Sequence, residues 1–278
     1  MKKLILSVAV MTAFATHANA QTAAAPAPAA AAAAPEASPF TGNLAVASDY
    51  RFRGISQTFK QPTVQGGFDY AHSSGFYIGN WNSNVSGIQY LNGGSLEMDL
   101  YGGFKFEPVK GLGLDIGALY YYYPGSSITV GTTDVKYNNA EVYFGTSYKW
   151  FSLKYNHGVT DFFGLKASTA PSYAFTALTP NGSSKNSGYL DFNVNIEVAD
   201  KTTLNLHAGR QTVKNYGVLS YSDYKIGISR DFGFATIGLA GISTNANKNY
   251  WKATNGASTP AIKELGTSTA VLTISKTF

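Results

Sequence analysis

A strict alternation of apolar and polar side chains is the feature of this sequence that most constrains its fold. In residues 95–106, SLEMDLYGGFKF, one set of alternate positions carries Leu96, Met98, Leu100, Phe104 and Phe106. The other set carries Glu97, Asp99, Tyr101 and Lys105. Side chains of a β-strand point alternately to opposite sides, so this segment predicts a strand with one apolar and one polar face. The alternation alone does not say which face lies inside the molecule.

The same pattern recurs along the chain. It is clear in residues 43–54, 111–122, 139–150, 188–198 and 268–278, and weaker in residues 63–71, 75–83, 151–159, 203–211, 221–229 and 234–243. Together with residues 95–106, these segments predict about twelve strands, with an error of about two either way. A length of about 9–11 residues suits a tilted membrane crossing.

The connections between the segments alternate in length. Short ones lie at 72–74, 107–111, 149–150, 199–202 and 230–233, and longer polar ones lie at about 84–94, 124–138, 160–187, 213–220 and 244–264. Outer-membrane barrels have short periplasmic turns and longer external loops. The connection at residues 59–62 departs from this rhythm, because it is short where a long external loop is expected.

The number of strands decides which face is inside. A barrel of about 8 strands can fill its interior with side chains, whereas a wider one leaves a hole. With the apolar face toward lipid and the polar face toward a wet lumen, closure also satisfies every backbone hydrogen bond. The sequence therefore predicts an all-β, transmembrane antiparallel β-barrel of about twelve strands. It assigns Leu100 and Ile116 to lipid near the middle of the membrane.

A soluble periplasmic β-sandwich is the competing fold, because sandwiches show the same alternation. The terminal Phe278, preceded by apolar residues at alternate positions, resembles the signal by which the barrel-assembly machinery recognises its clients, although Lys276 interrupts that pattern. We take Phe278 as a candidate assembly signal. A terminal phenylalanine can also occur by chance.

The first 39 residues divide into two parts. Lys2 and Lys3 precede a short apolar run, and Ala18-Asn19-Ala20 has the form of a signal-peptidase site, which predicts a signal peptide at 1–20 cut after Ala20. The Ala/Pro-rich residues 21–39 predict a loosely extended periplasmic tether. Residues 40–278 remain for one barrel domain, in the bacterial outer membrane.

Composition narrows the class further. The chain has no cysteine and therefore no disulfide framework. Its formal charge of +5 falls to +3 when Lys2 and Lys3 leave with the signal peptide, which is too weak and scattered to indicate nucleic-acid binding. No run of 18 apolar residues exists, so no membrane-spanning helix is predicted.

Residues 48–81, SDYRFRGISQTFKQPTVQGGFDYAHSSGFYIGNW, resemble the opening signature of the TorF-family porins of Gram-negative bacteria. Residues 96–106 and 111–125 resemble the strands that follow in that family. The resemblance implies an outer-membrane β-barrel with a transport role and does not define a substrate.

The polar faces supply candidate lumen residues. The bases are Arg51, Arg53, Lys105, Lys149, Lys154 and Lys225, and the acids are Asp49, Asp69, Glu97, Asp99, Asp115, Glu141, Asp191, Glu197 and Asp223. Nine acids against six bases favour small cations, since a pore lined by carboxylates lowers the barrier to positive solutes. Opposite charges on neighbouring strands can also pair. Asp49, Arg51 and Arg53, placed on one strand face, are the candidate constriction.

An enzyme is the third and least supported interpretation. It has to be considered because some outer-membrane barrels are hydrolases. His72 lies in a turn, His157 shares an apolar face, and His207 shares a face with Asn205 if Thr203 and Gly209 point inward. No G-x-S-x-G motif or metal-spaced histidine pair occurs. We predict no catalytic residue, no metal and no cofactor.

Two further features lie near strand ends and in loops. Tyr120–Tyr123, Trp81 and Trp150 are assigned to interfacial aromatic girdles, with a ligand-stacking platform as the alternative for the tyrosines. Lysines of the long loops could meet outer-membrane lipid and the phosphates of lipopolysaccharide, or serve solubility alone; they are Lys136, Lys166, Lys185, Lys214, Lys248 and Lys252.

Two functions remain beside the enzyme. One is a porin that lets small polar or charged solutes diffuse through a narrow charged lumen. The other is a structural or adhesive barrel with a plugged pore and partner-binding external loops. The sequence does not identify the solute, the oligomeric state or a gate.

Overall fold

The computed structural model describes residues 38–173, 178–254 and 262–278. The predicted signal peptide, the cleavage site after Ala20 and nearly all of the tether lie outside the described residues.

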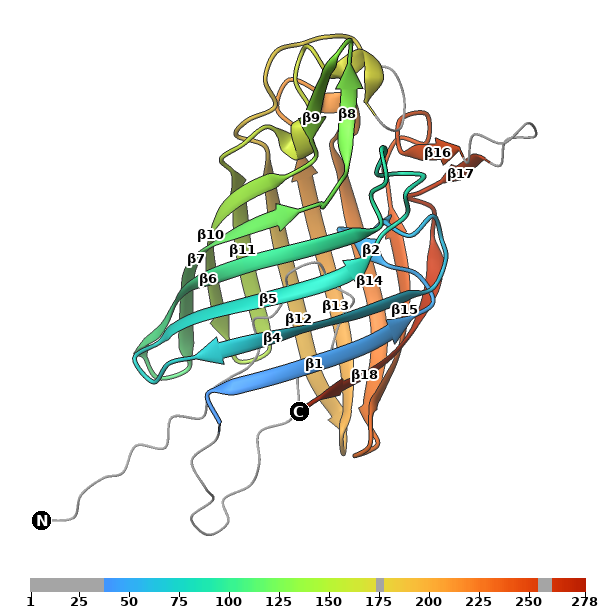
Figure 1. Cartoon of the computed structure of the whole chain (residues 1–278). Coiled ribbons are helices and arrows are strands. Elements are labelled where there is room, and N and C mark those ends of the chain that lie inside the picture. Colours follow the sequence, from blue (N-terminus) through green and yellow to red (C-terminus); the bar gives the residue numbers. More distant parts are fainter. Residues whose placement is uncertain (1–37, 174–177, 255–261) are drawn as a thin grey trace, which may run out of the picture.

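Twelve strands form a closed antiparallel barrel (Figure 1). They are β1 (Phe40–Ala47), β4 (Thr63–Ala71), β5 (Phe76–Asn84), β6 (Leu96–Val109), β7 (Leu112–Tyr122), β10 (Asn139–Tyr148), β11 (Phe151–Gly158), β12 (Gly188–Ala199), β13 (Thr202–Thr212), β14 (Tyr221–Asp231), β15 (Thr236–Thr244) and β18 (Thr269–Thr277). β1 closes the barrel by pairing with β4 on one side and β18 on the other. The prediction of an all-β barrel of about twelve strands is confirmed.

The long connections carry small elements of their own, most of them at the end of the barrel opposite the start of β1 and the end of β18 (Figure 1). They are the hairpins β2–β3 (Arg51–Phe52 and Ile55–Ser56), β8–β9 (Ser127–Val130 and Thr133–Lys136) and β16–β17 (Lys252–Thr254 and Ile262–Glu264), and the 3₁₀ turns η1 (Phe162–Gly164), η2 (Ala170–Ser172) and η3 (Gly217–Leu219). Short turns join the strands at the other end. No helix among the described residues has both the length and the apolar character needed to cross a membrane.

The first strand is shorter than the sequence indicated. β1 ends at Ala47, whereas alternation continues to Gly54. The chain leaves the wall because the Asp49 carboxylate accepts hydrogen bonds from the Ser56 and Thr58 hydroxyls, at 2.7 and 3.0 Å. Arg53 and Gly54 then have positive φ angles of 48° and 79°, which form a tight turn. Residues 48–62 are therefore one long connection, and the apparent short loop at 59–62 is only its final part.

The outer surface is apolar, as the assignment of faces requires. Leu100 and Ile116 are 47% and 51% exposed on the outside of the barrel, while Asp99 and Asp115 on the opposite faces are fully buried. Exposed aromatic side chains gather near both ends of the strands, including Phe68, Phe76, Phe234, Tyr120, Tyr122 and Tyr224. An apolar band between aromatic girdles is the surface of a transmembrane barrel.

The aromatic residues assigned to the girdle divide between the two faces. Tyr120 and Tyr122 are exposed, but Tyr121 and Tyr123 are buried inside, because consecutive residues of a strand cannot share a face. Trp81 was also assigned wrongly: it lies inside, edge-on to Tyr50 with 5.4 Å between ring centroids. Trp150, in the turn after β10, is exposed.

Inward glycines make room for tyrosine rings. A Cβ atom at Gly209 would lie 2.1 Å from the Tyr189 hydroxyl and 2.6 Å from the Asp223 carboxylate, whereas one at Gly238 would meet nothing closer than 3.6 Å. We expect Gly209→Ala to lower the free energy of unfolding by about 1–3 kcal/mol through overpacking. Gly238→Ala is the matched control, with little effect expected. Urea unfolding in detergent checks this, and equal midpoints for the two variants would contradict the packing.

Candidate functional site in the lumen

Residues 48–62 fold into the barrel and fill its external half. We call this segment the plug. Tyr50, Arg51, Ile55 and Ser56 are between 0% and 3% exposed, so the plug is buried as deeply as a protein core. Phe52 packs edge-on against Tyr121 of the wall, with ring centroids 5.5 Å apart. The plug thus seals the external half of the lumen with close-packed side chains.

Arg51 fastens the plug to the last external loop. Its Nε contacts the Asp49 carboxylate at 2.6 Å. Its Nη1 donates to the backbone carbonyls of Leu265 and Thr267, at 2.9 and 3.0 Å. Near the end of the plug, the Lys60 ammonium donates to the Thr267 hydroxyl at 2.7 Å, and partial burial together with the nearby Arg51 charge lowers the pKa of Lys60. These contacts tie the plug to the β17–β18 connection.

Arg53 fastens the plug to the wall. One guanidinium nitrogen contacts the Glu141 carboxylate of β10 at 2.6 Å, and another donates to the Gln211 side chain of β13 at 2.8 Å. The guanidinium also lies over the Tyr189 ring of β12, 4.3 Å from its centroid. Since both Arg53 and Glu141 have buried side chains, this pair is an ionic contact held inside the barrel.

Below and around the plug, tyrosine hydroxyls bond to inward carboxylates. Tyr77 donates to Asp115 at 2.7 Å and Tyr101 donates to Asp69 at 2.6 Å. Tyr123 donates to Glu97 at 2.6 Å, and Tyr50 of the plug donates to the other oxygen of the same carboxylate. These rings occupy space that the sequence analysis assigned to a water-filled lumen. The tyrosine rings narrow the lumen, because each lies along the inner surface of the wall and reaches a carboxylate one or two strands away.

His207 is the centre of a second polar cluster, on β12–β14. Its Nδ1 lies 3.1 Å from an Asp191 oxygen, and its Nε2 lies 2.6 Å from an Asp223 oxygen. Its side chain points inward, as the placement of Thr203 and Gly209 suggested. Its contacts join three strands of the wall, and both ring nitrogens already face carboxylates. The arrangement is suited to holding strands together rather than to activating a nucleophile.

Most of the charged residues predicted to line the lumen face inward, but they lie at different heights along the barrel axis. Lys105 lies over Tyr77 and Lys154 lies over Tyr143, each with the ammonium 4.4 Å from the ring centroid. Lys149 is wrong as a lumen residue, because it lies exposed in the turn after β10 with a positive φ angle of 53°. Asp49, Arg51 and Arg53 lie in the plug, so their predicted placement on one face of a wall strand is wrong. That they form a constriction stays a prediction.

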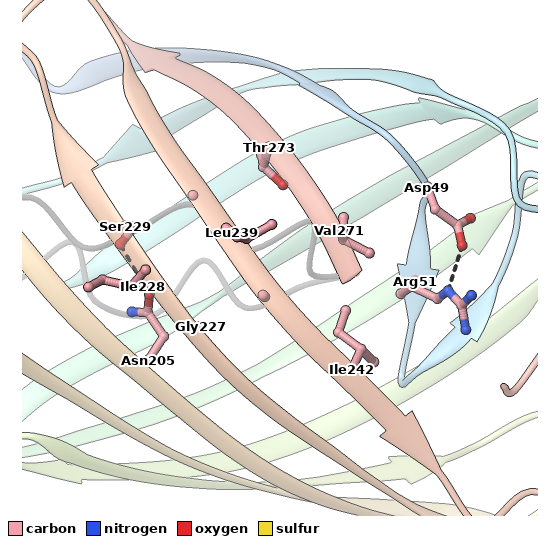
Figure 2. A pocket seen from close by; sticks show the side chains of 12 residues that line it. Asp49, Arg51, Asn205, Gly227, Ile228, Ser229, Leu239, Ile242, Val271 and Thr273 are labelled. Atoms are coloured by element: carbon pink, nitrogen blue, oxygen red, sulfur yellow. Dashed lines mark hydrogen bonds and ion pairs between the residues drawn. The ribbon is translucent and has the colours of Figure 1, made fainter. Parts of the chain in front are cut away.

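Several buried polar atoms of the lumen have no hydrogen-bond partner within the described protein. They are Nη2 of Arg51, Oε1 of Gln65, both carboxylate oxygens of Asp99, Oδ2 of Asp115 and Nζ of Lys154. Figure 2 shows a small cavity near the first of these, with Asp49 and Arg51 on one side and Asn205 and Ser229 on the other. Its volume of about 20 Å³ exceeds the roughly 10–15 Å³ that one water molecule needs. The interior therefore combines an apolar cluster around the plug with polar atoms that lack a hydrogen-bond partner in the described protein.

No group of three or more histidine or acidic side chains within the described ranges is arranged to hold a metal ion. The prediction that the chain binds no metal or cofactor stays a prediction.

Two solved structures are similar to the barrel. The KdgM porin matches with a TM-score of 0.49 and 5% identity, over 86% of this chain and 98% of that one. The NanC porin matches with a TM-score of 0.47 and 8% identity, over 85% of this chain and 97% of that one. The assignment of the fold rests on the strand pairing and not on these similarities.

Comparison by sequence is more decisive. No curated protein matches the sequence. A family model described as "bacterial protein of unknown function (Gcw_chp)" matches residues 29–278, which is nearly the whole chain. The chain therefore belongs to the Gcw_chp family of bacterial proteins.

Proposed function

We propose that this protein is an outer-membrane channel through which small polar or charged solutes diffuse passively, and that the plug closes it in the conformation described. The apolar belt fits a bilayer, and the charged inward faces fit an aqueous path. The signal-peptide pattern and Phe278 support export to the outer membrane and recognition by the barrel-assembly machinery. The resemblance of residues 48–81 to the TorF-family porins supports the same assignment.

The observation that carries the proposal is the set of unpartnered polar atoms inside the barrel. A barrel that served only as a scaffold would gain by satisfying such groups or replacing them with apolar ones, because each unpaired buried group costs about 1–3 kcal/mol. Asp99, Asp115 and Lys154 each have a buried polar atom without a hydrogen-bond partner, on three strands of the wall. A wall that must solvate passing solutes needs such groups.

The charges of the wall indicate which solutes pass. Without the plug, the wall carries eight acids against three lysines, a formal surplus of five negative charges; the acids are Asp69, Glu97, Asp99, Asp115, Glu141, Asp191, Glu197 and Asp223, and the lysines are Lys105, Lys154 and Lys225. Such a wall lowers the barrier to positive solutes. The plug itself contributes Arg51 and Arg53, which oppose cations while it is in place.

Planar lipid bilayers test the proposal. We expect brief, low-conductance openings of the purified protein and a reversal potential under a KCl gradient that indicates preference for K⁺. The preference should weaken in Asp69→Asn and stay unchanged in Glu107→Gln, whose carboxylate lies exposed near the periplasmic turn. A preference for Cl⁻ would contradict the assignment of the wall.

A second function is favoured by the depth at which the plug is buried. A barrel sealed this firmly can act as a structural or adhesive protein whose external loops bind a partner. The loop lysines, Lys136 and Lys214 among them, are exposed and could contact lipopolysaccharide phosphates. Wild-type protein that never conducts, while variants with a loosened plug do, would favour this second function.

A further inference from the structure

The outward face of β5 differs from the rest of the barrel surface. Asn80, Asn82 and Asn84 follow one another on the side that faces lipid, from the middle of the strand to its external end. No other strand of the described barrel places two amide side chains in succession on its outward face. Asn84 has a local role, because its Oδ1 accepts from the Val64 amide at 2.7 Å and from the Thr63 hydroxyl at 3.0 Å. Asn80 and Asn82 need another explanation.

The chain satisfies these two amides poorly. Asn82 Nδ2 donates to Asn80 Oδ1 at 2.6 Å, but its contact with the Gly66 carbonyl is 3.3 Å long. Asn80 Nδ2 lies 3.3 Å from Asn82 Oδ1 and 3.4 Å from the Asp99 carbonyl. Three of these four distances exceed the usual range of about 2.7–3.2 Å. In hydrocarbon no water supplies the missing bonds, so the amides carry a cost that a protein partner would remove.

The neighbouring strands make this face suitable for contact. Asn82 pairs in register with Gly66 of β4, which has no side chain, and with Met98 of β6; Asn80 pairs with Phe68 and Leu100. β4, β5 and β6 lie next to one another in the wall (Figure 1). Small residues that permit close approach, together with amides that bond across the contact, are typical of contacts between membrane helices. The same two features occur together on this face of the barrel.

We propose that this face, defined by Gly66, Asn80, Asn82 and Met98, is the contact between two copies of the chain in the membrane. An asparagine amide both donates and accepts, so the same patch on two copies related by a two-fold axis is self-complementary. A lipid tail can satisfy neither role. The proposal concerns the outside of the barrel and does not depend on the proposed channel function.

Energy transfer between labelled copies in phosphatidylcholine vesicles tests the proposal. The chain has no cysteine, so Thr132→Cys at the exposed tip of the β8–β9 hairpin gives a single labelling site. We expect transfer between copies that persists as the protein is diluted in lipid. Asn80→Leu/Asn82→Leu should weaken association by about tenfold or more, because both copies lose the amides that bond across the contact. Thr146→Leu on the outward face of β10 is the control, with no change expected.

A second measurement keeps the test independent of one variant. Ile78 and Ile226 are outward isoleucines of similar exposure, 64% and 62%, on β5 and β14. A cysteine-reactive cross-linker should join copies of Ile78→Cys much more than copies of Ile226→Cys. Heat-modifiable gel mobility shows that each variant is folded. Wild-type protein without energy transfer, or an unchanged signal in folded Asn80→Leu/Asn82→Leu, would overturn the proposal.

Discussion

Arg53→Ala should convert a mostly closed barrel into one that conducts readily. The substitution removes the ionic contact between the plug and β10 and leaves the Glu141 carboxylate buried without its partner. Breaking a buried pair in this way costs about 3–5 kcal/mol. Suppose that about 3 kcal/mol of this cost raises the free energy of the closed state and not that of the state with a displaced plug. Since each 1.4 kcal/mol is a factor of ten, the population with a displaced plug then rises roughly a hundredfold. Single-channel recording of open probability measures the change.

The variants of the pair distinguish release of the plug from general damage. Glu141→Gln should open the barrel as well, whereas the exchanged pair Arg53→Glu/Glu141→Arg should restore part of the closure. Arg210→Ala is the matched control, because Arg210 is exposed on the outward face of β13. Open probability that is the same in wild type, Arg53→Ala and Glu141→Gln would show that the plug does not control conduction.

The same variant should also change selectivity. Arg53 is the plug charge that lies against Glu141, so its loss exposes that carboxylate to the solute path. The reversal potential of Arg53→Ala under a salt gradient should therefore move further toward the cation limit. Arg51→Ala should have a smaller effect on the attachment of the plug to the barrel, because its ionic partner Asp49 lies in the plug itself. The contacts of Arg51 with the last external loop are made to backbone carbonyls, which stay uncharged when Arg51 is removed.

Local alternation was enough to predict the barrel, because the period of a strand is a property of the strand itself. Leu100 and Ile116 could be assigned to lipid from their own segments. The plug could not be found in this way, since residues 49–53 continue the alternation that the strand began. The strand ends because Asp49 accepts hydrogen bonds from Ser56 and Thr58. These residues lie too far along the chain for a pattern of alternate positions to reveal the contact.

The tyrosine rings inside the barrel escape this kind of prediction for a related reason. Counting strands gives the width of a barrel but not the length of the side chains that enter it. A signal was nevertheless present, because inward glycines and inward tyrosines lie on neighbouring strands. Gly209 of β13 leaves space for Tyr189 of β12, and Gly79 of β5 leaves space for Tyr101 of β6. Comparing the inward faces of adjacent strands therefore predicts tyrosine rings that lie over the glycines of the neighbouring strand.

Replacing Leu100 or Ile116 with arginine should prevent most of the protein from assembling. Both side chains point outward from the central part of their strands and are about half exposed at the surface of the barrel. An arginine at the midplane of the lipid-facing surface costs about 2–4 kcal/mol. That is a large fraction of the roughly 5–15 kcal/mol that separates most folded proteins from their unfolded state. The yield of heat-modifiable protein in the outer-membrane fraction measures the loss.

Depth in the membrane provides the matched control for this prediction. Val109 lies at the periplasmic end of the same strand as Leu100 and is 61% exposed. Arginine there should cost only about 0–1 kcal/mol, because its side chain reaches the aqueous interface. We therefore expect Val109→Arg to assemble almost as wild type while Leu100→Arg and Ile116→Arg do not. Equal tolerance of all three would place the apolar face away from lipid, and recovery of the wild-type chain with soluble periplasmic proteins would contradict its placement in a membrane.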